Sequence, residues 1–125
     1  MISNNRFWKI IENSGWANLS KQKEIDFNLE KKKNSSLYND CFYIHQAIQY
    51  YTSILQQRVR HYFQSHKNDM EFYENKYKMY LSDDTFWYLC NHIVGLGEDE
   101  YFKCMNNPIR IFKHKNFKEG FDYLF

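Results

Sequence analysis

The sequence predicts an all-α fold, and three features of its 125 residues support this prediction. The chain has one Pro and four Gly, so residues that favour turns are few. Aromatic residues make up 20% of it, which is ample for a buried core in one domain of this length. No run alternates between apolar and polar residues for long enough to require a strand. We therefore expect residues 1–125 to form a single domain, with about five helices around a long central one and a short irregular C-terminal segment.

The N-terminal third predicts one well-defined helix and one weaker helix. The first helix should follow a polar cap, bury a face that begins at Phe7, and end near Gly15. A second helix is expected from Ser20, but only Ile25 and Leu29 form its apolar stripe. This segment is interpreted as a surface helix or a partly ordered connection.

A polar break, Lys31-Lys32-Lys33-Asn34-Ser35-Ser36, separates this segment from the central helix. A solvated loop is the favoured interpretation of such a run, and an anion-binding patch is the alternative.

The central helix is expected over residues 37–66. Apolar residues recur there at alternating spacings of four and three, which places them on one helical face. They are Leu37, Cys41, Ile44, Ile48, Tyr51 and Leu55. Arg58 interrupts the stripe, which resumes at Val59. This helix should form the spine of the fold.

Shorter elements complete the chain. We expect a helix over 71–79 and another over 83–96, the latter packed against the spine. Ser82 is a suitable N-cap for it, and Asp83 and Asp84 complement the helix dipole in its first turn. A further helix should span 98–106 and end at Asn107-Pro108. The tail is ambiguous: 109–112 could be extended, and the last residues look like a docked turn.

Several of these residues also resemble a known family. Phe7-Trp8, Ser82-Asp83-Asp84 followed by Phe86 and Tyr88, Gly97 with Tyr101, and Asn107-Pro108 are similar to the bacterial family of domains of unknown function numbered 4240. Its pattern also has a Gly pair, an Arg and a Trp where this chain has Tyr80-Leu81, Cys90 and His92, so the resemblance is to a divergent member. It implies a helical fold and no particular activity.

The sequence offers two candidate chemical sites. Cys41, His45, Cys90 and His92 have the right composition for tetrahedral zinc, but side chains two residues apart on a helix diverge. Asp83 or Asp84 acting with His92 would suit a small hydrolase, although no phosphate-binding loop or metalloprotease motif accompanies them. We therefore expect no catalytic residue, metal or cofactor.

The favoured function is a non-catalytic protein-binding module, in concrete form an immunity protein that neutralises a bacterial toxin domain. Short length, the lack of a catalytic motif and the surplus of Tyr and Trp favour it, because these side chains serve as interface anchors. A nucleic-acid-associated protein is the alternative, and a small hydrolase comes third. The net charge of +2 is too small to indicate a nucleic-acid or membrane partner.

Once the expected core is assigned, six residues are left as candidates for outward display and partner binding: Tyr50, Arg58, Arg60, His61, Tyr88 and His92. No signal peptide or membrane span is visible, and three cysteines suit reduced thiols better than a disulfide framework. A cytoplasmic location is therefore expected.

Overall fold

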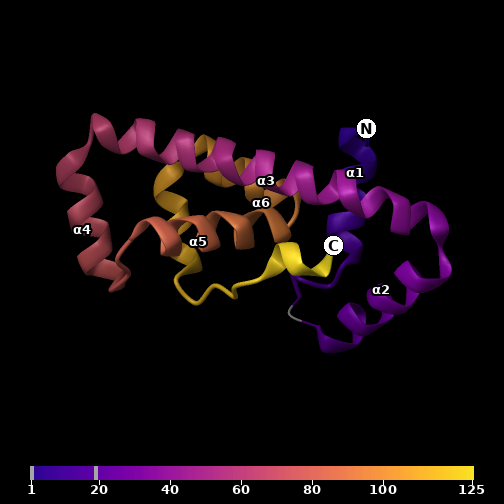
Figure 1. Ribbon diagram of the computed structural model, residues 1–125. Helices are drawn as coiled ribbons and strands as arrows, with labels where there is room; N and C mark the ends of the chain where they lie inside the picture. The colour runs from indigo at the N-terminus through magenta and orange to yellow at the C-terminus, as the bar shows by residue number, and fades with distance from the viewer. Residues whose placement is uncertain (1, 19) are drawn as a thin grey trace.

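The computed structural model describes residues 2–18 and 20–125, and within these ranges it contains helices and no strand (Figure 1). There are six α-helices and two short 3₁₀ helices in the described residues. In chain order they are α1 (Asn4–Asn13), α2 (Lys21–Lys33), α3 (Ser35–Gln64), α4 (Lys67–Tyr77), α5 (Asp83–Gly95), α6 (Glu98–Asn106), η1 (Pro108–His114) and η2 (Phe121–Leu124). The predicted all-α fold is confirmed.

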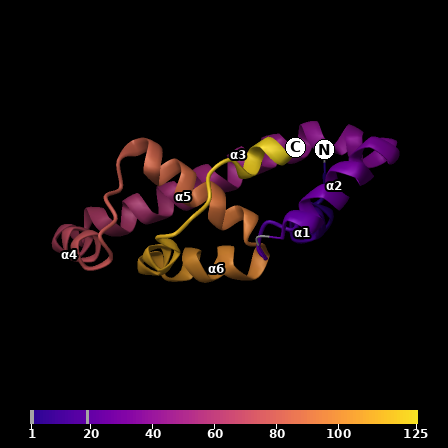
Figure 2. The ribbon, with the colours of Figure 1, turned by 90° about the horizontal axis from the view of Figure 1, so that it is seen from below.

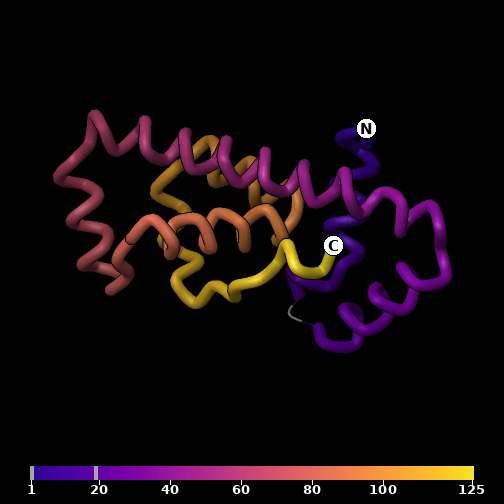
Figure 3. The backbone as a smooth tube through the Cα atoms, viewed as in Figure 1, coloured from indigo at the N-terminus to yellow at the C-terminus, as the bar shows by residue number. Residues whose placement is uncertain are grey.

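The 30-residue helix α3 is the spine on which the other elements are arranged. Helix α5 runs back along it in the opposite direction and is its main packing partner, as predicted. Helices α2 and α4 lie at opposite ends of α3 (Figures 1 and 2). The tube in Figure 3 shows the chain after α6 turning through η1 and returning past α5 to end at η2.

Side-chain caps explain where four of the helices begin. Ser3, Ser20, Asn34 and Ser82 each accept a hydrogen bond from the backbone N–H three residues further on. Such a bond satisfies one of the N–H groups that the first helical turn leaves without a partner. The predicted Ser82 cap is thereby confirmed, because its Oγ accepts from the N–H of Thr85.

The predicted apolar stripe of α3 is largely confirmed. Ile44, Ile48 and Leu55 are fully buried, and Val59 continues the stripe. Fully burying an aliphatic side chain of this size contributes about 1.5–3 kcal/mol, so this stripe is a major part of the driving force for folding. Cys41 departs from the prediction: it is only half-buried and lies at the edge of the stripe.

An aromatic cluster joins three helices at the centre of the core. The ring of Tyr51 on α3 lies 5.0 Å from the rings of both Phe7 and Trp8 on α1. Tyr101 on α6 lies 5.4 Å from Trp8, and its hydroxyl donates to the carbonyl of Tyr51 at 2.9 Å. Aromatic pairs at these separations add to stability beyond the area they bury. These contacts fix α1 and α6 on the same side of the spine.

Three boundaries differ from those expected. The triple Lys run is not a loop: Lys31–Lys33 forms the last turn of α2, where the helix dipole favours cations, and Asn34 caps α3 at once. Helix α4 starts at Lys67, earlier than the predicted 71. It ends at Tyr77, and the next residue, Lys78, has the left-handed conformation. The segment from Pro108 to His114 is a 3₁₀ helix and not extended, because its apolar side chains pack inward on one face.

Candidate functional site

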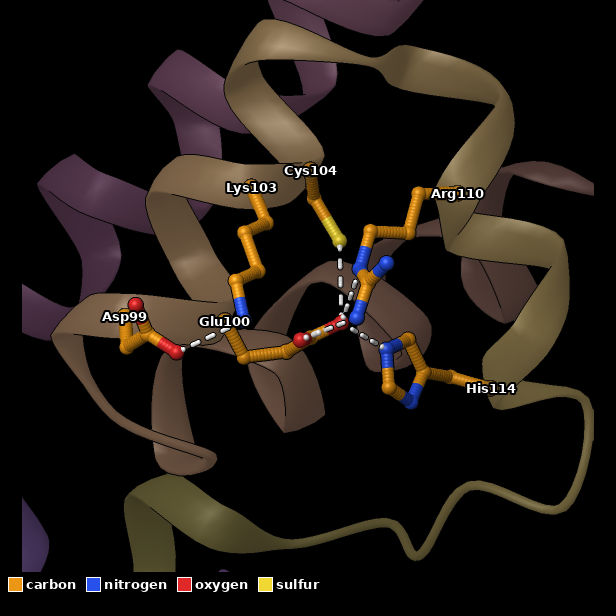
Figure 4. Close-up of polar contacts among 6 residues, drawn as sticks. All are labelled: Asp99, Glu100, Lys103, Cys104, Arg110 and His114. Atoms are coloured by element: carbon orange, nitrogen blue, oxygen red, sulfur yellow. Dashed lines mark hydrogen bonds and ion pairs between the residues drawn. The ribbon is translucent and has the colours of Figure 1, made fainter.

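Three polar side chains meet between α6 and η1 (Figure 4). Glu100, in the first turn of α6, accepts from Arg110 through both oxygens, with Nε–Oε1 at 2.7 Å and Nη2–Oε2 at 3.0 Å. Nε2 of His114 lies 2.7 Å from the same Oε1. The thiol of Cys104, one turn along α6, is 3.8 Å from that oxygen. The carboxylate is therefore enclosed by three partners.

The environment fixes the charge of this cluster. Burial alone would raise the pKa of Glu100, but the hydrogen bonds from Arg110 and His114 outweigh it and hold the pKa at about 2. Burial raises the pKa of Cys104 to about 12, so its thiol stays protonated at neutral pH. Glu100 is thus an anion, and Cys104 is a poor nucleophile.

Glu100, Cys104 and His114 are also the group in the described residues whose ligand atoms lie close enough to share a metal ion. Nε of the Arg110 guanidinium lies 2.7 Å from Oε1 of Glu100, and its positive charge would repel a metal cation at this carboxylate. A metal would also have to displace the proton of the Cys104 thiol, whose pKa is raised by burial to about 12. The arrangement acts as a clamp between α6 and η1.

The sequence showed Glu100 only as one of three acidic residues in a first turn, and nothing in its spacing marked Arg110 or His114 as partners.

His92 is not displayed outward as predicted. Its side chain is buried on α5, and Nδ1 accepts two hydrogen bonds, from the Trp16 indole N–H at 3.0 Å and the Lys118 backbone N–H at 3.2 Å. Burial and the neighbouring His114 lower the pKa of His92 to about 4. The prediction was wrong because the apolar face of α5 is wider than its stripe suggested. Trp16, far away in sequence, covers the position.

The five other predicted binding residues are spread along α3 and α5. Tyr50, Arg60 and His61 are exposed, with Tyr50 at 62%. Arg58 and Tyr88 are half-buried. Nε of Arg58 donates to the carbonyl of Met105 at 3.0 Å, which gives a partner to one of the free carbonyls at the end of α6. Tyr50 and His61 are eleven residues apart on one helix, about 16 Å. The structure does not gather these residues into one site.

The two chemical alternatives are not assembled either. Asp83 is fully exposed at the start of α5, and His92 is buried nine residues later, about 13 Å along the axis. Arg60 lies 3.8 Å from Asp83, a contact between exposed side chains that contributes little. Among the residues described here, no three of Cys41, His45, Cys90 and His92 bring their ligand atoms close enough to share a metal ion.

A groove between α2 and the first turns of α3 is the most distinctive surface feature. One hollow of about 800 Å³ is lined by residues of both helices, namely Asn28, Lys31, Lys32, Lys33, Ser35 and Tyr38. A second, of about 610 Å³, shares Lys31 and Tyr38 with it and continues along α3 past Phe42. The two hollows are neighbours on either side of Lys31 and Tyr38, and we call them together the α2–α3 groove. Of this groove, the sequence indicated only the lysines, through the less favoured interpretation of the triple Lys run as an anion-binding patch.

Comparison with known families bears on the whole chain. The model of the family described as "Protein of unknown function (DUF4240)" matches residues 2–125. The chain belongs to this family. Neither the curated proteins nor the solved structures gave a match. The resemblance seen in the sequence is thus confirmed, and in this DUF4240 chain the divergent position His92 is a buried residue of the core.

Proposed function

We propose that this DUF4240 chain is a non-catalytic module that binds a partner protein through the surface around the α2–α3 groove. One observation carries the proposal: two large aromatic side chains, one helical turn apart on α3, are exposed along this groove. Tyr38 is 69% exposed and Phe42 65% exposed, and both line the groove.

Exposure of this kind is costly for a protein that acts alone. Single apolar side chains on a surface are common, but contiguous apolar patches mark interaction sites. Aromatic residues at the centre of an interface contribute most of its binding energy, because they bury a large area and have few rotatable bonds. Tyr38 and Phe42 have these properties, and neither contributes to the core.

The state of the titratable groups also supports a binding role. Glu100 is occupied by Arg110 and His114, Nδ1 of His92 accepts two donors, and the thiol of Cys104 is protonated. A catalytic acid, base or nucleophile needs a free lone pair or a proton near its working pH. Glu100, His92 and Cys104 offer neither a free lone pair of this kind nor such a proton.

The concrete form we propose is a cytoplasmic protein that neutralises a toxin domain. No helix in the described residues is long and apolar enough to cross a membrane. The three cysteines are free thiols, as expected in a reducing compartment. A toxin partner predicts that co-expression relieves the toxicity of a gene adjacent to this one. The absence of such a gene would remove this form and leave the binding proposal standing.

The test of binding compares two matched double variants. Tyr38→Ser with Phe42→Ser removes the groove aromatics, and Phe72→Ser with Tyr80→Ser removes two equally exposed aromatics at the α4 end. Each tagged chain is used to capture proteins from its native host, with retention measured by quantitative mass spectrometry at low and high salt. We expect a protein retained by the wild type and the α4-end variant and lost from the groove variant. Equal retention by all three would refute the proposal.

A further inference from the structure

We infer that the α2–α3 groove binds an acidic segment of the partner in extended conformation, with Asp or Glu alternating with apolar side chains. This inference rests on the proposed function and specifies the chemistry of its partner. It is carried by the placement of cations and exposed rings along one groove.

The cations line one wall of the groove. Lys31, Lys32 and Lys33 all contribute to it. Nζ of Lys31 donates to the backbone carbonyl of Leu124, so this lysine is already engaged. Lys32 and Lys33 are exposed, and neither takes part in an ion pair among the residues described. Two ammonium groups beside a hollow favour a partner with at least two carboxylates.

The rings line the part of the groove that belongs to α3. Tyr38 and Phe42 are four residues apart, on the same side of the helix and about 6 Å apart along its axis. In an extended peptide, side chains two residues apart point the same way and are separated by about 6.6 Å. Two alternate apolar side chains can therefore contact Tyr38 and Phe42 in register. The side chains between them then point away from α3. Where the segment continues past Tyr38 into the first hollow, its carboxylates can meet Lys32 and Lys33.

The same geometry argues against a nucleic-acid strand. Phosphate neutralisation supplies much of the affinity for nucleic acid through counterion release, and strongly bound proteins make about six to ten such contacts. The groove offers two unpaired lysines and no arginine. The exposed rings could stack on bases, but stacking without a track of cations leaves the strand weakly held.

The experiment selects ligands without assuming their sequence. A random dodecapeptide library displayed on phage is panned against the immobilised full chain, and the recovered peptides are sequenced. We expect enrichment of Asp and Glu alternating with Leu or aromatic residues. A fluorescein-labelled copy of the most enriched peptide is then titrated by anisotropy, alongside a labelled uridine oligonucleotide of the same length.

Two charge-reversal variants identify the binding surface. Lys32→Glu with Lys33→Glu should weaken peptide binding about tenfold, equivalent to about 1.4 kcal/mol. Lys67→Glu with Lys115→Glu, which makes the same change in net charge at exposed positions away from the groove, should leave it unchanged. The peptide should also slow alkylation of Cys41, which lines the groove.

Several results would overturn the inference. These are a panning that yields no peptides, peptides without acidic enrichment, equal loss in both charge-reversal variants, or tighter binding of the oligonucleotide. The proposed function is judged separately by the host capture. A partner retained by the Lys32→Glu, Lys33→Glu variant at low salt but lost from the Tyr38→Ser, Phe42→Ser variant would preserve protein binding and exclude the acidic segment.

Discussion

The indole N–H of Trp16 donates to Nδ1 of His92 across 3.0 Å, and this bond joins the turn after α1 to the last turn of α5. The backbone N–H of Lys118 donates to the same nitrogen at 3.2 Å, which adds the segment before η2. Above Trp16, Nζ of Lys118 lies 4.3 Å from the ring and 2.6 Å from a carboxylate oxygen of Glu24 on α2. A neutral imidazole thus holds together three parts of the chain that are distant in sequence, and the ion pair of Lys118 with Glu24 adds α2 to them.

This arrangement predicts a loss of stability in mild acid. The pKa of His92 is lowered from 6.5 to about 4 by burial and by His114, so the unfolded chain binds this proton more readily than the folded one. The free energy of unfolding should therefore be highest above pH 6.5 and fall by about 3 kcal/mol as the pH approaches 4. Urea denaturation at several pH values measures this slope.

The control for this prediction replaces the titrating group and keeps its acceptor. In His92→Asn, the amide oxygen occupies a position close to that of Nδ1, so Trp16 and Lys118 keep a partner that cannot be protonated. The slope between pH 6.5 and pH 4.5 should flatten in this variant and persist in His61→Asn, which changes an exposed histidine. An unchanged slope in His92→Asn would mean that another group causes the loss.

The Glu100 clamp predicts a second effect on stability. Glu100→Gln removes the charge but keeps the shape, and it should lower the free energy of unfolding by about 2 kcal/mol, because hydrogen bonds to charged groups contribute about 1.5–3 kcal/mol. Asp99→Asn is the matched control: its ion pair with Lys103 is exposed and should contribute less than about 0.5 kcal/mol. Chemical denaturation at neutral pH compares them. Similar losses would show that Glu100 is no more than a surface charge.

Replacing Gly95 by Ala should lower stability, whereas the same replacement within a helix usually raises it. In a helix, Ala is favoured over Gly by about 1 kcal/mol. A Cβ on Gly95, however, would lie 2.5 Å from Cδ1 of Trp16 and 2.8 Å from Cδ1 of Phe121. Gly95→Ala should therefore destabilise the fold by about 1–3 kcal/mol through overpacking. Combining it with Phe121→Leu should recover part of this loss in a double-mutant cycle, and purely additive effects would contradict the contact.

Most of the fold could be predicted from the sequence because its signals are local. The spacing of Ile44, Ile48 and Leu55 defines a helical face without knowledge of what covers it. The cap at Ser82 depends on an N–H only three residues away. Such features are complete within one turn of helix.

The polar sites could not be predicted, because their partners are brought together only by folding. His92 is bonded to Trp16, 76 positions earlier, and the sequence alone left His92 as a residue for outward display. Gly95 makes room for Trp16 and Phe121, and neither neighbour is close to it in sequence. The α2–α3 groove exists because Asn34 ends one helix and caps the next, which turns the triple Lys run toward Tyr38.

The three cysteines should differ in reactivity. Cys41 is half-buried and lines the groove, whereas Cys90 and Cys104 are fully buried. Burial raises the pKa of all three thiols, to about 12 for Cys104, and only the thiolate reacts. Iodoacetamide should therefore label Cys41 first in the native state, and all three at similar rates in denaturant. Mass spectrometry of timed digests gives the three rates separately. Native labelling of Cys104 as fast as that of Cys41 would show that the contact between α6 and η1 opens readily.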